Sequence, residues 1–387
     1  MIDPDKYRWL KIEPVDAWFF RDGRPSIRGE DQSDIESEFP PNPTTVVGAL
    51  RAALARANGW SGSGSWSDEA SELKQTLGDG FDDLGKLVFL GPFLSKEFEQ
   101  NGGERRLELL WPLPQHVVGR SMDGSFIPEG LMQPSRELIC CDVSTDGIRL
   151  PEVGTNQTSP SDASEQRKPP SHPDDIYVTT TGFNAILSGE RPKPEECIPA
   201  CDLYVHESRV GIRRDAETRT TASGDIYSPR YLRLKRGVSL VHAVSGVPEQ
   251  WNWPTIMPLG GESRLATVER LDQVPELPTA RSGNAAVAIA LTPTRFEPDW
   301  WGAGPGEPAK TLSMELGGQV TCVALDRPRL IGGWDFKTNA PRPLVPFAPA
   351  GTVWWLEKDA TDSPGLTQVG SHSAYGYGLV ALSTVSQ

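Results

Sequence analysis

Long apolar runs are missing from this chain of 387 residues. No stretch approaches the roughly 18 apolar residues of a membrane-spanning helix. The start, MIDPDKYRWLKIEP, lacks the basic region and apolar run of a secretion signal. Cysteine is scarce, and its number, five, is odd, which argues against a disulfide framework and favours a reducing compartment. We therefore expect a cytoplasmic protein that does not contact a membrane.

The residue patterns of metal and nucleotide chemistry are also missing. Cys197 and Cys201 are four positions apart, but no second pair or nearby histidine completes a zinc site. The sequence has no Walker-type loop, no HExxH motif and no nucleophile elbow. Its histidines are scattered, at His116, His172, His206, His242 and His372. We expect neither a metal nor a cofactor.

Positive charge is in short supply. There are 38 Lys and Arg against 52 Asp and Glu, a net charge of −14, whereas nucleic-acid-binding proteins usually carry a basic surface. Taken alone, this total favours a protein partner or a neutral substrate. Charge acts over about 8 Å in physiological salt, however, so its distribution matters more than its sum. Residues 206–242 hold eight basic and four acidic side chains, a basic island in an acidic chain.

The stretch that organises the chain, residues 18–59, begins with an aromatic run and a turn. The run WFF ends an expected strand, and the turn after it presents Arg21 and Arg24 on either side of Asp22. An acidic loop over residues 29–38 contains no Lys or Arg. The two arginines are candidates for phosphate binding. An Arg-Asp pair that braces the turn is the alternative, and the sequence leaves both open.

A helix is expected after the prolines that end this loop. Thr44 or Thr45 can cap its start, and apolar residues at positions 46, 47, 50, 53, 54 and 57 recur at the spacing of one helical face. Gly59 stands where a C-terminal cap belongs. Gly48 is unfavourable inside a helix, so we expect a close approach of another backbone or a ligand there. Arg51 lies on the side that the apolar stripe leaves free.

The rest of the chain alternates like strands far more than it repeats like helices. Expected strands cover residues 8–15, 87–94, 107–118, 238–247, 265–270, 285–291, 317–325, 352–356 and 379–385. Two further helices are expected, a short one that is capped by Ser67 or Asp68 and runs to about residue 77, and one over 179–188. Residues 151–175 have five prolines and two apolar side chains, so we expect a disordered insertion. The pattern predicts an α+β protein.

The basic island has the composition of an RNA-binding hairpin. Arg213, Arg214 and Arg219 could pair with phosphates while Tyr227 stacks on a base. The alternative is a solvated hairpin in which Asp215 and Glu217 neutralise the arginines.

Two glycine-rich turns are further candidates for phosphate contact, because glycine lets backbone N–H groups approach an anion. One has Gly260, Gly261 and Arg264. The other lies in an uncharged C-terminal stretch that runs from residue 366 to 387 and includes Gly370, Ser371, Tyr375, Gly376 and Gly378. A tight turn that feeds the last strand is the alternative interpretation of the second.

Four blocks together carry a resemblance to a known family. They are FRDGRP with FPPNPTTVVGALRAAL, then RVGIRRDAETRTTASGDIYSPRYLRL (209–234), LGGESRLATVE (259–269) and GSHSAYGYGLV (370–380). In this order they resemble the family of the third subunit of the Cmr complex, the type III-B CRISPR effector, within the RAMP superfamily of repeat-associated RNA-binding proteins. The blocks cover about a fifth of the chain.

The resemblance implies a fold and a division of the chain. The fold would be two tandem ferredoxin-like (RRM-like) domains with a glycine-rich C-terminal loop and a basic hairpin insertion. The N-terminal domain would span 1–205, including the insertion, the basic hairpin 206–237, and the C-terminal domain 238–387.

The resemblance also implies a non-catalytic, RNA-binding subunit. Its partners would be the 5′ handle of a CRISPR RNA (crRNA), the large polymerase-like subunit, the backbone RAMP subunit and, indirectly, target RNA. The predicted RNA-binding residues are Arg21, Arg24, Arg51, Arg209, Arg213, Arg214, Arg219, Tyr227, Arg230, Gly260, Gly261, Arg264, Ser371, Tyr375, Gly376 and Gly378.

Two other functions stay open at this point. Some RAMP proteins process RNA with a loop histidine, so His372 with Tyr375 could form a ribonuclease site. Twelve Trp residues, including the pairs Trp300-Trp301 and Trp354-Trp355, together with 52 carboxylates, could instead describe a carbohydrate-active protein. Packing in the core is the alternative interpretation of the Trp pairs.

Overall fold

The computed structural model describes most of the chain, and every structural statement below concerns this part. The described ranges are 2–21, 37–66, 71–99, 103–122, 124–141, 144–153, 170–212, 226–279, 285–297, 315–316, 318–335, 340–357 and 365–385, together with residue 218.

Sheets dominate, with helices packed against them, so the α+β class is confirmed. The α-helices are α1 (Pro43–Ala57), α3 (Ser71–Leu77) and α4 (Thr180–Leu187), and short 3-10 turns are η1 (Pro4–Lys6), η2 (Pro194–Glu196), η3 (Ala200–Asp202) and η4 (Ser373–Tyr375). Helices were expected at all three α-helical segments, and all three are confirmed. Among the described residues, no helix has the length and apolar character to cross a membrane.

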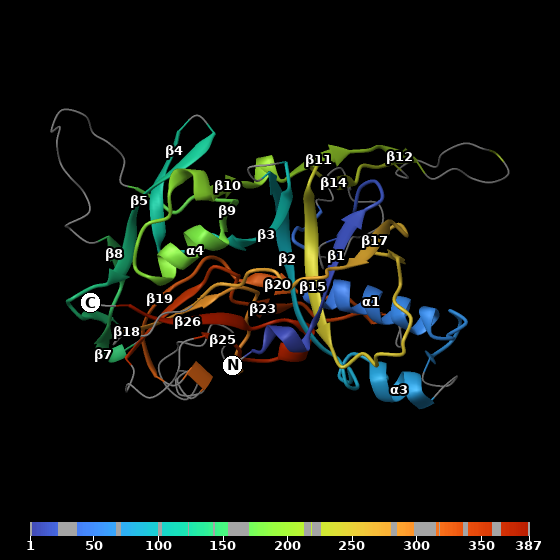
Figure 1. Cartoon of the computed structure of the whole chain (residues 1–387). Coiled ribbons are helices and arrows are strands. Elements are labelled where there is room, and N and C mark those ends of the chain that lie inside the picture. Colours follow the sequence, from blue (N-terminus) through green and yellow to red (C-terminus); the bar gives the residue numbers. More distant parts are fainter. Residues whose placement is uncertain are drawn as a thin grey trace.

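The first sheet has eight antiparallel strands and forms the centre of the molecule (Figure 1). In spatial order they are β10 (Cys197–Pro199), β9 (Ile176–Thr179), β3 (Arg105–Pro112), β2 (Val88–Glu99), β15 (Val238–Ser245), β1 (Arg8–Pro14), β17 (Leu265–Arg270) and β16 (Ile256–Pro258). Because side chains alternate across a strand, Leu10 and Ile12 of β1 contribute to one buried cluster and Trp9 to another.

Helix α1 covers one face of this sheet. Its apolar stripe packs with β1, β15 and β17 in a single core, as the spacing predicted. The helix begins at Pro43 with Asn42 as N-cap, so the predicted caps Thr44 and Thr45 are wrong. The hydroxyl of Thr44 instead lies 3.2 Å from that of Tyr377. Gly59 follows the helix with φ +106°, as expected for a C-terminal turn.

The predicted close approach at Gly48 is wrong. A Cβ atom added there would meet nothing within 4 Å. The residue therefore lowers helix propensity without a packing reason in this structure.

The second sheet has five antiparallel strands and packs against the other face of the first. Its order is β19 (Gln319–Ala324), β24 (Val353–Glu357), β18 (Ala285–Ala290), β26 (Leu379–Val385) and β25 (Gly365–Gln368). One continuous cluster joins the sheets, with Trp9 and Phe93 from the first and Ile289 and Ala381 from the second. The two halves of the chain therefore share a core.

The position of β15 differs from the predicted domain boundary. Residue 238 was expected to open the C-terminal domain, but β15 lies between β2 and β1 in the first sheet, and β16 and β17 follow in that sheet. The reason is burial on both faces, since every residue of β15 except its last is buried, and such a strand belongs in a sheet centre. The chain changes sheets between β17 and β18. The tandem ferredoxin-like topology stays a prediction.

Smaller strand pairs surround the two sheets. The remaining strands are β4 (Val117–Met122), β5 (Ser125–Pro134), β6 (Ile139–Cys141), β7 (Ser144–Ile148), β8 (Pro151–Val153), β20 (Arg329–Ile331), β21 (Trp334–Asp335), β22 (Ala340–Pro341) and β23 (Val345–Phe347). The expected insertion 151–175 is wrong at both ends, because β8 pairs with β5 and Ser171 pairs with Gly119. Residues 154–169 lie outside the described part.

Two antiparallel strand pairs lie within the predicted basic hairpin. β11 (Tyr204–Ser208) pairs with β14 (Arg230–Leu234), and further out β12 (Gly211–Ile212) pairs with β13 (Ile226–Tyr227). Figure 1 shows the hairpin projecting from the first sheet on the side away from β4 and β5.

Candidate nucleic-acid interface

Three segments that are far apart in the sequence meet at the root of the hairpin. The chain after β1 runs along β14, because Trp18 and Leu232 exchange two backbone hydrogen bonds of 2.9 and 2.8 Å. The turn between β16 and β17 joins them, since the backbone N–H of Gly261 donates to the carbonyl of Phe19 at 2.7 Å. The segment that leads into the predicted first turn, the hairpin and the glycine turn 260–264 therefore lie together.

We call the charged patch formed there the hairpin-base surface. It consists of Asp16, Glu207, Arg209, Tyr231, Arg233, Glu262 and Arg264.

The two glycines of the turn allow a close approach to the protein's own backbone. Gly260 has φ +86°, and a Cβ there would lie 2.6 Å from the carbonyl oxygen of Phe19. A Cβ on Gly261 would lie 2.8 Å from the Phe19 ring. The space that glycine leaves is filled by residue 19, and the N–H of Gly261 already donates to the Phe19 carbonyl. Contact of a phosphate with this turn stays a prediction.

Two carboxylates hold the arginines of the hairpin. Glu207 accepts hydrogen bonds from the Nε atoms of Arg209 and Arg233, both at 2.8 Å. Asp16, just beyond β1, lies 3.2 Å from Arg209 Nη2 and 2.9 Å from Arg233 Nη2. Arg264 joins from the glycine turn, 3.6 Å from both Asp16 and Glu262. One network thus connects all three segments.

Tyr231 lies at the centre of this network. Its ring has the guanidinium carbons of Arg209 and Arg264 at 4.9 and 4.3 Å from its centroid, which is favourable cation–π geometry. Its hydroxyl donates to the carboxylate of Glu262, and its ring packs against Phe19. Only 4% of the residue is exposed, so this tyrosine is not available to stack on a base.

The charges of the network reinforce each other. Hydrogen bonds from Arg233 and Arg209 lower the pKa of Asp16, and those from Arg209 and Arg233 lower the pKa of Glu207. Hydrogen bonding to Glu207 raises the pKa of Arg209 in return. Three arginines therefore face three carboxylates. The predicted alternative, in which Asp215 and Glu217 neutralise the arginines further along the hairpin, concerns residues outside the described part and stays a prediction.

Other predicted contacts at this end of the molecule are only partly visible. Arg21 is exposed and its backbone bridges to Ser37. Arg230 is half-buried at the start of β14, opposite Ser208. The side chain of Tyr227 and the whole of Arg24, Arg213, Arg214 and Arg219 lie outside the described part of the structure.

Arg51 was predicted to bind RNA, but its side chain lies in the interior of the protein. The residue is 5% exposed, and its guanidinium donates to the carbonyls of Leu77, Gly80 (2.8 Å) and Asp83 (2.9 Å). It thereby closes the end of α3 and the loop that follows. An internal brace of this kind presents no donor to RNA, so the predicted free side of α1 is wrong at this residue.

The C-terminal glycine-rich loop, residues 370–378, is a packed joint between the two sheets. A Cβ on Gly376 would lie 2.4 Å from the carbonyl oxygen of Gly91 in β2, and a Cβ on Gly378 would lie 1.8 Å from that of Val369. The hydroxyl of Tyr375 donates to the carbonyl of Phe81 at 2.6 Å, and burial raises the pKa of Tyr375 to about 12.

The backbone donors of this loop are already in use. The N–H groups of Ser371, Tyr375, Gly376 and Gly378 donate to the carbonyls of Arg295, His372, Ser373 and Pro293, at 2.8 to 3.0 Å. A phosphate cradle needs these groups to be free. The tight-turn interpretation is therefore correct for the structure as it stands, and the predicted stacking of Tyr375 on a base is wrong because that side chain is buried.

His372 is the exposed residue of this loop, with φ +60°. Its ring lies 5.2 Å from that of Phe81, and partial burial followed by the charge of Arg295 lowers its pKa. Of the Trp pairs, Trp354 is fully buried and Trp355 packs beside the core that joins the sheets. Trp300 and Trp301 lie outside the described residues.

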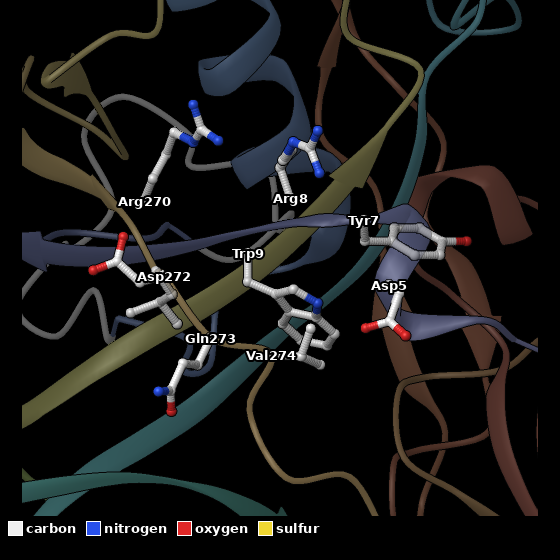
Figure 2. A pocket seen from close by; sticks show the side chains of 9 residues that line it. Asp5, Tyr7, Arg8, Trp9, Arg270, Asp272, Gln273 and Val274 are labelled. Atoms are coloured by element: carbon white, nitrogen blue, oxygen red, sulfur yellow. The ribbon is translucent and has the colours of Figure 1, made fainter. Parts of the chain in front are cut away.

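A hollow of about 480 Å³ lies beside the start of β1, and the side chains that line it do not converge on one point (Figure 2). Arg8 and Arg270 extend to one side of the strand and Trp9 to the other. Arg270 already lies over the ring of Trp253, and Arg8 lies 3.9 Å from Glu249. Within the described ranges, no cluster of three His, Cys, Asp or Glu side chains could hold a metal ion.

Sequence reasoning missed the residue that connects the site. Asp16 follows the first strand without any motif, and its partners lie about 190 residues or more further along the chain. Only the pairing of residue 18 with β14 brings them together.

The fold and the hairpin define a sheet-rich α+β protein with a basic antiparallel projection. The family model described as CRISPR-associated protein (Cas_Cmr3) matches residues 10–384. The chain belongs to this family, which confirms the resemblance of the four blocks. No curated protein matches the sequence.

Solved structures of similar fold come from type III CRISPR complexes. A chain from the cryo-EM structure of the type III-B Cmr-beta bound to cognate target RNA and AMPPnP is 17% identical, with a TM-score of 0.44 over 90% of this chain and 86% of that one. A chain from the Csm3-Csm4 subcomplex in the type III-A interference complex is 9% identical, with a TM-score of 0.37 over 97% and 98%. At such scores, neither carries an argument about residues.

Proposed function

We propose that the chain is a non-catalytic RNA-binding subunit of a type III CRISPR effector, which anchors the crRNA 5′ handle and docks the large polymerase-like subunit. Family membership supports the place in such a complex. One observation supports the RNA-binding surface: the segment that leads into the first turn, the root of the basic hairpin and the turn 260–264 meet at one place.

The hairpin beyond its root is the part of this surface that we expect to bind phosphate. At the root, Arg209, Arg233 and Arg264 are paired with carboxylates, so the net positive charge there is small. Arg213, Arg214 and Arg219 lie further along the hairpin sequence and extend the basic island. We therefore assign RNA contact to these three and orientation to the root.

A binding titration tests this proposal. The full chain, alone and with its large-subunit partner, is titrated with handle and scrambled RNA at several salt concentrations. For single strands the log-log salt slope is about 0.7 per phosphate neutralised. Replacing Arg213 and Arg219 with Ala should weaken handle binding and lower the slope by about 1.4, the value for two phosphates.

The matched control removes two arginines elsewhere. Arg120 and Arg191 both contact Glu129 on the β4–β5 side of the molecule, and their replacement with Ala changes the net charge equally. An equal loss of handle binding in this control would show that only total charge matters. Absence of handle-selective binding by the parent chain, alone and with its partner, would defeat the proposal.

The non-catalytic assignment has its own test. A ribonuclease would use exposed His372 with Tyr375, but the Tyr375 hydroxyl is committed to the Phe81 carbonyl and buried. We expect no cleavage of handle RNA by the parent chain. If the parent chain cleaves handle RNA and His372→Ala does not, the chain processes RNA and the anchoring proposal is wrong.

The acidic remainder is proposed to face protein partners and to repel stray RNA. Its densest stretch is the loop that contains Glu30, Asp31 and Asp34. Replacing these three with Lys should weaken assembly with partner subunits and increase non-specific RNA binding. If neither property changes, the acidic loop has no such role.

A further inference from the structure

Asp16 is the one carboxylate of the hairpin-base surface that touches all three arginines. Its two oxygens lie 2.9 Å from Arg233 Nη2, 3.2 Å from Arg209 Nη2 and 3.6 Å from Arg264 Nη1. Arg209 belongs to the hairpin's outgoing arm, Arg233 to its returning strand β14 and Arg264 to the turn 260–264. One side chain therefore connects every segment at the root.

One face of the hairpin root is held by the main core, through Tyr204 and Leu232. On the other face, where the arginines lie, the apolar contacts form a satellite cluster of Ala17, Phe19 and Tyr231. Backbone bonds between Trp18 and Leu232 add a bridge between the chain after β1 and β14. With so small an apolar cluster on the arginine face, orientation there depends on polar contacts.

We propose that Asp16 is a positioning residue: it holds the basic hairpin in the direction in which the arginines further along bind RNA. This inference rests on the proposed function. It opposes the simple electrostatic expectation, because a carboxylate beside an RNA-binding surface repels phosphate and its removal should strengthen binding.

The direction in which one substitution changes RNA affinity distinguishes positioning by Asp16 from repulsion of phosphate by Asp16. Asp16→Asn removes one negative charge and weakens three ion pairs at nearly constant side-chain size. If Asp16 positions the hairpin, handle RNA binds about tenfold more weakly, since a few partly exposed ion pairs contribute about this factor. The salt slope stays unchanged, because the arginines that contact phosphate are not altered.

Glu13→Gln is the matched control. Glu13 lies three residues earlier, at the end of β1, is exposed to a similar degree and pairs with Lys11 at 3.3 Å, without contact to the hairpin. It removes the same charge, and handle affinity should stay the same or rise slightly. Asp16→Glu, which keeps the carboxylate, should recover part of the lost affinity.

Hydrogen exchange of the β14 amides supplies a readout that does not depend on RNA. In Asp16→Asn, residues 230–234 should exchange faster than in the parent chain, while β1 and β15 stay unchanged. Glu13→Gln should leave β14 exchange unaltered.

The outcomes are distinct. Tighter RNA binding with a steeper salt slope in Asp16→Asn would overturn the inference. It would show that Arg209, Arg233 and Arg264 bind RNA directly and that Asp16 weakens this binding. Unchanged binding in Asp16→Asn would also overturn it. If the parent chain bound no RNA, the proposed function itself would fail, and faster β14 exchange in Asp16→Asn would still support the bracing of the hairpin by Asp16.

Discussion

The turn 260–264, which joins the hairpin-base surface, and the glycine-rich loop 370–378 were both predicted to contact phosphate, and the structure surrounds them differently. Each has an arginine close by, Arg264 or Arg295. At the hairpin root the arginines are about one-quarter to two-fifths exposed and meet carboxylates. In the loop, Tyr375, Gly376 and Gly378 are buried and pack on other backbone segments.

The difference teaches where a glycine-rich turn can bind a phosphate. Such a turn needs free N–H groups and open space in front of them. In the loop, the donors face carbonyls of the same chain and the space is filled by Gly91 and Val369. At the turn 260–264 the space is filled by Phe19. Glycine in both places allows close packing between segments.

The strongest test of the packed loop is Gly378→Ala. The new Cβ would lie 1.8 Å from the carbonyl oxygen of Val369, so one backbone must move. We expect a loss of more than about 3 kcal/mol in the free energy of unfolding, in the range of the most disruptive substitutions, measured by denaturant titration.

Gly64→Ala is its control, because Gly64 has the same φ of +68° with nothing within 4 Å of its Cβ. Only the cost of the left-handed backbone, about 1 kcal/mol, should appear there. Equal losses in both variants would show that strain in φ and not packing determines the need for glycine in the loop.

Arg51→Ala tests whether an arginine predicted to bind RNA is an internal brace. Three carbonyls, of Leu77, Gly80 and Asp83, would lose their donor in a buried site. The expected loss is about 3 kcal/mol of unfolding free energy, measured by thermal or denaturant unfolding.

Arg56→Ala on the same helix is the matched control, since its exposed guanidinium lies over the ring of Trp60. It should cost about 0.5 kcal/mol. If Arg51→Ala remains as stable as the parent chain but binds RNA more weakly, Arg51 contacts RNA and is not an internal brace.

High pH should weaken the loop before it weakens the hairpin root. Burial raises the pKa of Tyr375 from 10.0 to about 12, so the folded state holds the phenolic proton more tightly than the unfolded state. The resulting stability is fully present below pH 10 and is lost as the pH rises toward 12. Unfolding free energies measured across this range should fall.

Tyr375→Phe should flatten this fall. At neutral pH it should cost about 1 kcal/mol, because the Phe81 carbonyl loses its hydrogen bond. A variant with an unchanged alkaline profile would mean that other buried tyrosines, such as Tyr177 and Tyr204, carry the effect.

The smallest expected effect belongs to the hairpin root. Arg264→Ala removes ion pairs of 3.6 Å to Asp16 and Glu262 and the contact with the Tyr231 ring. Because these groups are partly exposed, we expect a loss of at most about 1 kcal/mol. High salt should reduce that loss. A loss as large as that in Gly378→Ala would show that the root is as tightly built as the loop.

Periodicity and turn chemistry determined much of the fold from the sequence. The apolar stripe of α1 placed that helix on the sheet, and the alternating runs located β15, β17, β18, β24 and β26 within a few residues. A hairpin was also predicted where cations alternate with small and polar residues, in the segment that ends in Tyr227 and Tyr231. Such signals are local, so a sequence carries them without reference to its partners.

Tertiary structure alone decided which residues are free to act. The sequence could not show that Arg51 would turn inward to α3, or that Asp16 would meet three arginines from distant segments. It also placed the domain boundary before β15, which pairs with β1 and β2 across long sequence separations. Burial, ion pairing and register depend on residues far along the chain, and only the packed fold determines which residues become neighbours.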